Sequence, residues 1–465
     1  MTLEIYNTLT NEKEPFLPLE DKKVKMYVCG VTVYDDIHMG HARSIITFDM
    51  VARFLRYKGY QVTHVTNFTD VDDKIIDRAA EMGLEPLELS QMYIDHYFED
   101  VEQLGVKKAD LYPKASESIA DIIEMVQRIV EEGNGYVTSD GSVYLSVENF
   151  PDYGKLSGNI LEDLSAGARV SVEEEKRHPM DFALWKGAKP GEISWPSPWG
   201  DGRPGWHIEC SAMIYRYLGE TIDIHGGGND LIFPHHENEI LQSEAVLHHP
   251  LSKYWMHNGM LQVQDAKMSK SLKNFFTVRT VMDLYTTQEV RFYFLNTHYR
   301  GPLNYSEDAL NEACASLRRL QHTYTELKDY IETASGSYDS EELIKKTKAG
   351  FVEQMEDDFN TRGAIAELFD LARETNKLMH HEMLSKKGAK GIIALFEEFD
   401  QILGILPGME HSPDQFDDIM EVIINIRQEL RKRKLYDLAD RIRDSLAEKG
   451  VVLEDTAEGV KWKLD

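Results

Sequence analysis

Two short segments carry side chains suited to work on a phosphorylated ligand. They are His38, Gly40 and His41 in the first, and Lys267, Ser269 and Lys270 far downstream in the second. A helix start with a glycine offers unpaired backbone N–H groups and lets an anion approach the backbone closely. Lysines are compact point charges that can neutralise a triphosphate. Taken alone, paired histidines are more often surface or capping residues, and two lysines are often part of a solvated basic loop. The nucleotide site is therefore predicted from the combination of the two segments.

A second group of residues could bind a metal ion. Two of the three cysteines, Cys29 and Cys210, are expected at the ends of core elements. In a helix that begins at Pro234, His235 and Glu239 are four residues apart and project from one face. Two thiolates, an imidazole and a carboxylate are donors that zinc accepts. Buried cysteines also pack as small hydrophobic residues, and these donors follow no spacing rule, so both interpretations stay open at this point.

The surrounding pattern predicts a sheet that would position the first segment. Alternating apolar residues over 24–28 indicate a strand that ends at Cys29-Gly30, and apolar residues at helical spacing over 39–55 indicate a helix that stops near Gly59. A second strand over 61–66 completes a β-α-β unit. Open α/β sheets bind ligands at the carboxyl ends of their strands. We therefore expect a doubly wound, Rossmann-like α/β domain with a parallel sheet.

The second half of this domain begins near residue 205. A helix is expected from 206 to a stop near Gly219, then a strand over 221–225, with the glycines at 226–228 forming a turn at its carboxyl end. Acidic residues spread over 69–74 could indicate a calcium or magnesium loop. A helix N-terminus explains them better, because the helix dipole favours acidic side chains there. A zinc-protease helix is excluded, because His236-Glu-Asn-Glu-Ile lacks the second histidine.

The remaining chain predicts an insertion and two further domains. A hairpin turning at Asp140-Gly141 is followed by a glycine- and proline-rich stretch over 151–204. Beyond residue 291, amphipathic helices are expected over 306–331, 341–357, 361–380 and 389–403. The boundaries that we expect are 1–120 and 205–305 for the halves of the catalytic domain, 121–204 for the insertion, 306–406 for a helical bundle and 407–465 for a small mixed C-terminal domain.

Length and composition limit the classes of protein that fit. A chain of 465 residues exceeds what one hydrophobic core usually serves. The sequence lacks the roughly 18 consecutive apolar residues of a membrane span and lacks a signal pattern, so a cytoplasmic protein with no membrane partner is expected. The net charge of −29 argues against general affinity for nucleic acid, but it leaves room for a specific RNA partner on a locally basic surface.

Taken together, these motifs resemble the paired signatures of class I aminoacyl-tRNA synthetases. Further segments are similar to the cysteinyl-tRNA synthetase family over essentially the whole chain: Thr69-Asp-Val-Asp-Asp-Lys74, Arg203-Pro-Gly-Trp-His-Ile-Glu-Cys-Ser211 and Phe233-Pro-His-His-Glu-Asn-Glu239. The resemblance implies that ATP, with Mg²⁺, and L-cysteine form cysteinyl-adenylate and that the cysteinyl group passes to tRNA(Cys). It also implies one zinc ion per chain and a monomer, with residues 121–204 as the family's connective insertion.

The resemblance implies four sets of site residues. The zinc ligands are Cys29, Cys210, His235 and Glu239. The ATP-binding and catalytic residues are His38, Gly40, His41, Lys267, Ser269 and Lys270. The cysteine contacts are Thr69, Trp206, His225 and Asp230, with His225 and His236 able to orient the metal ligands. The anticodon contacts in the C-terminal domain are Arg431, Tyr436, Asp440 and Asp455.

The residues themselves support an RNA-binding C-terminus without requiring it. Arg431-Lys-Arg-Lys434 is a rare basic run in an acidic chain, and Tyr436 could stack on a base. A solvated helix end is the alternative, because basic residues are favoured there. The resemblance favours the RNA-binding interpretation.

Three positions depart from the family pattern. Met39 replaces the usual isoleucine, which is a mild change, and Lys273 stands where glycine is common. Lys74-Ile-Ile-Asp77 lacks the second lysine of a pattern associated with pyridoxal phosphate and persulfide formation, which argues against that activity.

Two other functions remain alternatives. One is a cysteine ligase that passes the same adenylate to an amino sugar, and the other is a non-catalytic regulator that binds zinc and a nucleotide.

Overall fold

A computed structural model describes residues 2–159, 176–263, 266–267 and 276–407 and, with breaks, 423–464. It divides into two compact units, Met1–Ile405 and Leu406–Asp465, which are described separately. Within the described residues, no helix is long and apolar enough to cross a membrane.

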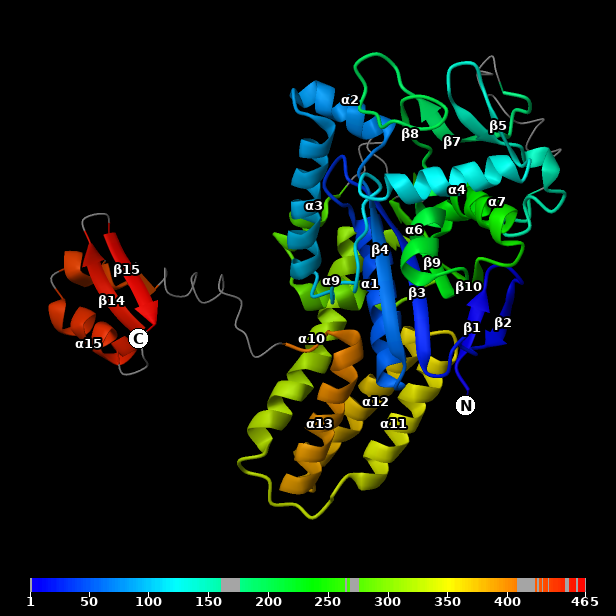
Figure 1. The fold of residues 1–465 in the computed structure, drawn as a ribbon. Coiled ribbons are helices and arrows are strands. Elements are labelled where there is room, and N and C mark those ends of the chain that lie inside the picture. The colour runs from blue at the N-terminus through cyan, green and yellow to red at the C-terminus, as the bar shows by residue number, and fades with distance from the viewer. Residues whose placement is uncertain are drawn as a thin grey trace. The chain divides into compact units, whose positions relative to one another are not determined.

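A four-stranded parallel sheet forms the centre of the first unit (Figure 1). Its strands are β3 (Lys23–Thr32), β4 (Gln61–Thr69), β9 (Ile222–Gly228) and β10 (Ser252–Asn258), in the order β10-β9-β3-β4. After β3 the chain adds β4 on one side of the central pair β9 and β3, and after β9 it adds β10 on the opposite side. The predicted doubly wound sheet is therefore confirmed, and its topological switch point lies between β3 and β9, where such sheets bind ligands.

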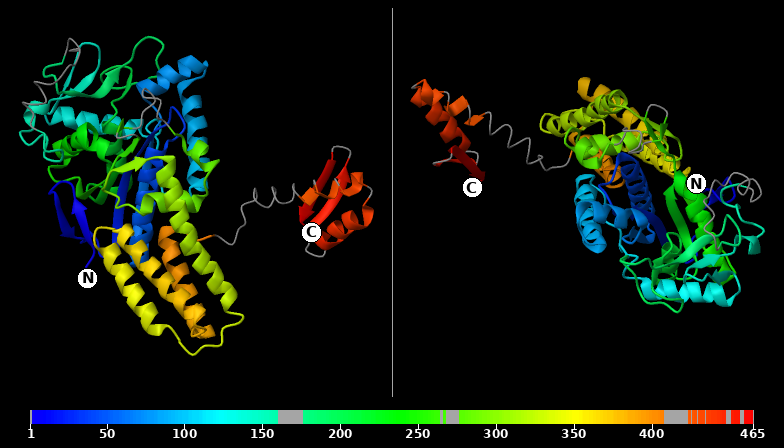
Figure 2. Two further views of the ribbon diagram at one scale, coloured as in Figure 1. Left: turned by 180° about the vertical axis from the view of Figure 1, so that it is seen from behind. Right: turned by 90° about the horizontal axis from the view of Figure 1, so that it is seen from above.

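Helices cover both faces of this sheet, as two further views show (Figure 2). Helix α1 (Met39–Tyr57) covers one face, where the ring of Phe48 packs so close to Gly226 that a Cβ there would lie 2.4 Å from it. Helices α6 (Ile208–Leu218) and α7 (Glu237–Leu247) cover the other. Their apolar residues share a buried core with Tyr27, Val65 and Trp255 of the sheet.

Four of the expected strand and helix boundaries were wrong. Strand β4 continues to Thr69, beyond the predicted end at residue 66. Strand β3 runs on to Thr32, because an irregularity between Val28 and Val31 shifts its register against β4 instead of ending the pairing. The glycines at 226–228 belong to β9, where parallel pairing with β10 keeps them extended. Helix α7 begins at Glu237, three residues after Pro234, because the segment Ile232–His236 before it is kinked, with Phe233 in an extended conformation.

A smaller antiparallel sheet precedes α6. It comprises β5 (Gly135–Val137), β6 (Val143–Leu145), β7 (Phe182–Gly187) and β8 (Gly202–Pro204), in that order, and α4 (Ile119–Glu131) shares its core. The predicted hairpin over 136–147 is confirmed by the β5–β6 pairing. Strand β8 ends at Pro204, so Trp206 and the start of α6 follow this sheet directly in the chain.

The predicted helix at the end of β4 is confirmed. Helix α2 (Asp73–Met82) has Asp72 as its N-cap, whose side chain accepts a hydrogen bond from the backbone N–H of Lys74. The Asp73 carboxylate forms ion pairs with Lys186 of β7 and Arg203 of β8. These acidic residues therefore have structural roles in the fold, and α3 (Pro86–Gln103) follows.

Four long helices complete the first unit. They are α10 (Glu307–Tyr330), α11 (Glu341–Glu356), α12 (Thr361–His380) and α13 (Lys386–Leu403), close to the predicted ranges. Each buries one apolar stripe against its neighbours. The bundle packs on the C-terminal end of α1, where the Tyr57 hydroxyl donates to Glu398 at 2.7 Å.

The short strands β1 (Glu4–Asn7) and β2 (Glu12–Pro15) pair at the N-terminus, and α8 (Val278–Met282) and α9 (Thr287–Leu295) precede the bundle.

The second unit contains a helix and a hairpin. Helix α15 (Tyr436–Ala447) packs on the antiparallel pair β14 (Val451–Thr456) and β15 (Gly459–Leu464). Ala439 and Val451 are buried between them, whereas Tyr436 is 55% exposed. The predicted C-terminal hairpin is confirmed.

We predict that the Asp49→Ala substitution strongly destabilises the chain. Asp49 of α1 and Arg291 of α9 form a buried ion pair at 2.9 Å, with side chains 2% and 1% exposed. Removing Asp49 leaves the buried Arg291 without its ion-pair partner, which costs about 3–5 kcal/mol. Urea unfolding of the full chain measures the loss. The exposed pair Asp370–Arg373 supplies the control, because Asp370→Ala should cost at most about 1 kcal/mol. Equal losses in the two variants would contradict this account of α1 packing.

Candidate active site

A cavity of about 670 Å³ opens at the carboxyl ends of β3, β4 and β9. Its wall contains residues from both halves of the sheet, and the predicted site residues among them are Cys29, His38, Gly40, His41, Thr69, Trp206, Cys210, Asp230 and His235. The switch point of the fold therefore brings together residues that lie up to about two hundred positions apart in the sequence.

The first signature caps helix α1. His38 is the N-cap, and its Nδ1 accepts a hydrogen bond from the backbone N–H of His41 at 3.2 Å. In return, Nδ1 of His41 accepts from the backbone N–H of His38 at 3.3 Å, and the rings stack with centroids 3.7 Å apart. This is a capping box made by two histidines. A Cβ at Gly40 would lie 2.8 Å from the His38 ring, so glycine is needed between them.

The cap also fixes the chemistry that His41 can perform. Burial, together with the nearby His38 and Lys74, lowers the pKa of His41 well below its usual value, so the ring is neutral at pH 7. A neutral imidazole that accepts at Nδ1 carries its proton on Nε2. His41 is therefore held as a hydrogen-bond donor, which suits contact with a phosphate oxygen.

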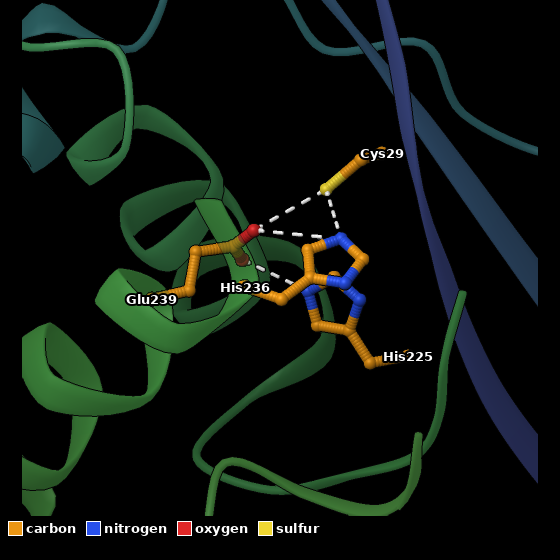
Figure 3. Close-up of side chains that lie close together, drawn as sticks. All are labelled: Cys29, His225, His236 and Glu239. Carbon is orange, nitrogen blue, oxygen red and sulfur yellow. Dashed lines mark hydrogen bonds and ion pairs between the residues drawn. The ribbon is translucent and has the colours of Figure 1, made fainter. Parts of the chain in front are cut away.

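Glu239 lies at the centre of a buried group of donors (Figure 3). Its Oε2 is 2.8 Å from Nε2 of His225, and its Oε1 is 3.3 Å from the sulfur of Cys29. Burial by itself would raise the pKa of Glu239, but His225 and His235 outweigh it and lower this pKa to about 2. The carboxylate is therefore ionised and can act as a ligand.

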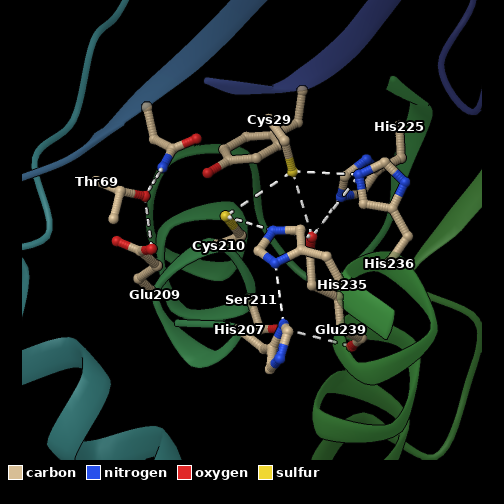
Figure 4. Close-up of polar contacts among 12 residues, drawn as sticks. Cys29, Thr69, His207, Glu209, Cys210, Ser211, His225, His235, His236 and Glu239 are labelled. Carbon is tan, nitrogen blue, oxygen red and sulfur yellow. Dashed lines mark hydrogen bonds and ion pairs between the residues drawn. The ribbon is translucent and has the colours of Figure 1, made fainter. Parts of the chain in front are cut away.

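The four donors predicted from the sequence converge (Figure 4). Ligand atoms of Cys29, Cys210, His235 and Glu239 all lie within 4.8 Å of one another. The two sulfurs are 3.9 Å apart, and Nε2 of His235 is 3.5 Å from Cys210 and 3.1 Å from Glu239. The i, i+4 relation of His235 and Glu239 holds although α7 starts later than expected.

The two thiols differ in their ease of ionisation. Burial would raise the pKa of Cys210, but the hydrogen bond from Cys29 and the charge of His235 lower it to about 6. Burial and the neighbouring Cys210 and Glu239 raise the pKa of Cys29 well above its usual value. Of the pair, Cys210 therefore carries the thiolate first.

Outer hydrogen bonds orient the histidines of this group, and the sequence did not reveal them. Nδ1 of His235 lies 3.0 Å from Nδ1 of His207, and Nδ1 of His236 lies 2.7 Å from Nε2 of His257. Histidines that bind metals usually hold their second nitrogen in this way. His207 precedes α6 within a segment already singled out, but His257 lies on β10 with no sequence signal to mark it.

Thr69 faces the same cavity from the end of β4. Its hydroxyl is 2.6 Å from Oε1 of Glu209, and both side chains are buried. Oε2 of Glu209 has no hydrogen-bond partner among the described residues. Burial and the nearby Cys210 raise the pKa of Glu209 well above its usual value. Across the cavity, the Trp206 ring lies 4.6 Å from that of His235 and is 40% exposed.

Some predicted residues cannot be placed in this cavity. Ser269, Lys270 and Lys273 lie outside the described residues, and only the backbone of Lys267 is described, paired with Gln262. Arg431, Tyr436 and Asp440 are exposed in the second unit, and Asp455 lies on β14, where only its backbone is described.

Comparisons with known proteins agree with this geometry. A family described as "tRNA synthetases class I (C) catalytic domain" matches residues 15–315, and a DALR domain matches residues 350–407. The chain is 51% identical to a cysteine–tRNA ligase of Carboxydothermus hydrogenoformans, covering 99% of this chain and 100% of that protein. It is 49% identical to one of Heliobacterium modesticaldum, covering 100% of both. A Mycobacterium tuberculosis methionyl-tRNA synthetase in complex with methionyl-adenylate has a TM-score of 0.63 at 13% identity, covering 82% of this chain and 92% of that one.

The fold is therefore that of a class I aminoacyl-tRNA synthetase. The family match covers more than half of the chain, and the sequence identity extends over whole relatives. The chain belongs to the cysteine–tRNA ligase family. The fold class and the family predicted from the motifs are both confirmed.

We predict that Thr69→Val lowers the free energy of unfolding by about 1–3 kcal/mol. The change removes the hydroxyl partner of the buried Glu209, and a buried polar group without a partner costs about that much. Urea unfolding measures it, with Thr69→Ser, which keeps the hydroxyl, as the matched control. Pairing Thr69→Val with Glu209→Leu should recover part of the loss. A valine variant as stable as the serine variant would show that the contact contributes nothing.

Proposed function

We propose that this chain activates L-cysteine with ATP, transfers it to tRNA(Cys), and uses one zinc ion to select the substrate. The observation that carries the proposal is the convergence of Cys29, Cys210, His235 and Glu239, because the first three of these line the cavity that His38 and His41 also line. The proposed site that selects cysteine and the proposed site that binds the nucleotide thus adjoin the same cavity.

The residues present fit zinc. Two sulfurs, an imidazole nitrogen and a carboxylate oxygen make a donor set that this ion accepts, and all four side chains are largely withdrawn from water. The outer contact of His207 with His235 supports the same assignment. Bound there, zinc would supply a Lewis acid that takes a thiolate readily and a hydroxyl poorly near neutral pH.

In the proposed reaction the cysteine carboxylate attacks the α-phosphorus of ATP, and pyrophosphate leaves. His41 donates from Nε2 to the phosphate oxygens as charge develops, with His38 beside it, and the positive end of the α1 dipole adds to this stabilisation. Lys267 and Lys270, with Mg²⁺, hold the pyrophosphate. Positioning and electrostatics are sufficient, so no protein nucleophile is needed.

Residues from both halves of the sheet would contact the substrate cysteine. We assign this role to Thr69, Trp206, His225 and Asp230, of which Thr69, Trp206 and Asp230 line the cavity. His225 is buried behind them and contacts Glu239. The hydroxyl of Thr69 is fixed by Glu209, so Thr69 presents a defined geometry to the substrate.

The domain assignments follow from this activity. Residues 1–120 and 205–305 form the catalytic halves, 121–204 the connective insertion, 306–406 the bundle and 407–465 the anticodon-binding domain, with Arg431, Tyr436, Asp440 and Asp455 as its contacts. A cytoplasmic monomer is part of the same proposal.

Amino-acid-dependent exchange of pyrophosphate into ATP tests the function. Cysteine should drive exchange, and His41→Asn should lower kcat by roughly 10²–10³-fold, because one donor to the developing charge is lost. Exchange driven by cysteine without transfer to tRNA, but with transfer to an amino sugar, would favour the cysteine ligase alternative. The absence of exchange with any amino acid would favour a non-catalytic regulator.

Replacement of one predicted ligand tests the metal assignment. Cys210→Ser should lower zinc per chain from about one to well below one, because a serine hydroxyl is a poor ligand. Cys314→Ser is the matched control, since Cys314 is buried in α10, away from these donors, and should retain its zinc. Elemental analysis after dialysis gives the result. Zinc retained with the wild-type affinity in the Cys210 variant would exclude this ligand set.

Removal of residues 408–465 tests the C-terminal assignment. Aminoacylation of tRNA should weaken, since base contacts are lost, whereas cysteine-dependent exchange should persist because the first unit is compact by itself. Parallel loss of both activities would contradict an anticodon-binding role.

A further inference from the structure

A second group of four donors lies beside the first and shares with it Cys29, which lines the cavity. Ligand atoms of Cys29, His225, His236 and Glu239 lie within 4.8 Å of one another (Figure 3). This group shares Cys29 and Glu239 with the proposed zinc ligands and has two histidines in place of Cys210 and His235. An imidazole-rich set with one thiol and one carboxylate is also suited to zinc.

Contacts with neighbouring residues orient the two histidines of this group. Nε2 of His236 lies 3.3 Å from the sulfur of Cys29, while its Nδ1 is fixed by His257 at 2.7 Å. The other nitrogen of His257 is 2.8 Å from the Thr8 hydroxyl. This chain of contacts aims Nε2 of His236 at the thiol, as outer contacts do for metal-binding histidines. His225 is held by stacking on Trp255, with centroids 4.4 Å apart.

Each carboxylate oxygen of Glu239 contacts a histidine of a different one of the two donor groups. Oε1 lies 3.1 Å from Nε2 of His235, and Oε2 lies 2.8 Å from Nε2 of His225. The sulfur of Cys29 likewise has Cys210 on one side at 3.9 Å and His236 on the other at 3.3 Å. A carboxylate and a thiolate placed in this way can bridge two cations, as carboxylates do in two-metal sites.

The geometry points to a second cation position in this chain, in which His225 and His236 bind an additional Zn²⁺ while Cys29 and Glu239 bridge it to the first. Two thiolates and one carboxylate bring three negative charges to the pair of ions, and three imidazoles complete their coordination. Because the proposed function assigns His225 to the cysteine pocket, an ion held by His225 competes with the amino acid. Zinc in excess of one equivalent therefore inhibits cysteine activation, and cysteine relieves this inhibition.

Equilibrium dialysis of the full chain against buffered Zn²⁺ tests the position without relying on activity. The wild-type chain should bind two equivalents in separate steps. His225→Gln and His236→Gln should each abolish the second step, for which they are ligands. The first step, for which His225 is only an outer contact through Glu239, should weaken by no more than roughly 10–100-fold. His249→Gln is the matched control, because this histidine is exposed and pairs with Glu220 away from the cluster. It should retain both steps.

Two results would overturn the inference. One is saturation of the wild-type chain at a single equivalent, which needs no variant to fold. The other is a second equivalent that persists in both histidine variants, which would place it elsewhere on the surface. The proposed function is judged separately, by cysteine-dependent exchange in protein that contains one equivalent.

Discussion

Burial of ionisable donors at one point of the sheet is the constraint on which the site depends. Cys210, His235 and Glu239 are at most 2% exposed, and an isolated buried charge is costly. Their mutual contacts offset that cost, since the Glu239 carboxylate is paired with His225 and His235. The zinc ion of the proposed function would balance the charge that two thiols and a carboxylate bring together. In the proposed function, ligand selection would therefore depend on the same few side chains whose contacts offset the cost of their burial.

The doubly wound topology is what makes this convergence possible. Cys29 comes from β3 and Thr69 from the end of β4, whereas Cys210 and Glu239 come from helices of the second half. These elements meet only because β3 and β9 are neighbours at the switch point. The histidine capping box places the nucleotide signature beside them, since α1 starts directly after β3. The antiparallel sheet then brings Trp206 over the donors.

The sequence predicted the parts of the site that have chemical or periodic signatures. Helix α1, the α2 N-cap and the four proposed zinc donors follow from residue types and spacing together with the family resemblance. Gly226 was misplaced in a turn, because glycine signals close approach without revealing whether a ring such as Phe48 or a bend requires it. Glu209 and His257 were missed since their roles arise from long-range contacts, to Thr69 and His236, that no local pattern encodes.

The central claim is that the buried donors select cysteine through a metal and not through shape. A pocket that relies on shape separates cysteine from serine by only about 1–3 kcal/mol, or roughly 10–200-fold. The direct measurement compares activation of cysteine and serine by the zinc-loaded protein and by protein stripped of zinc. The account predicts discrimination far above that range in the loaded protein and loss of cysteine activation in the stripped protein. Stripped protein that still activates cysteine and rejects serine would contradict it.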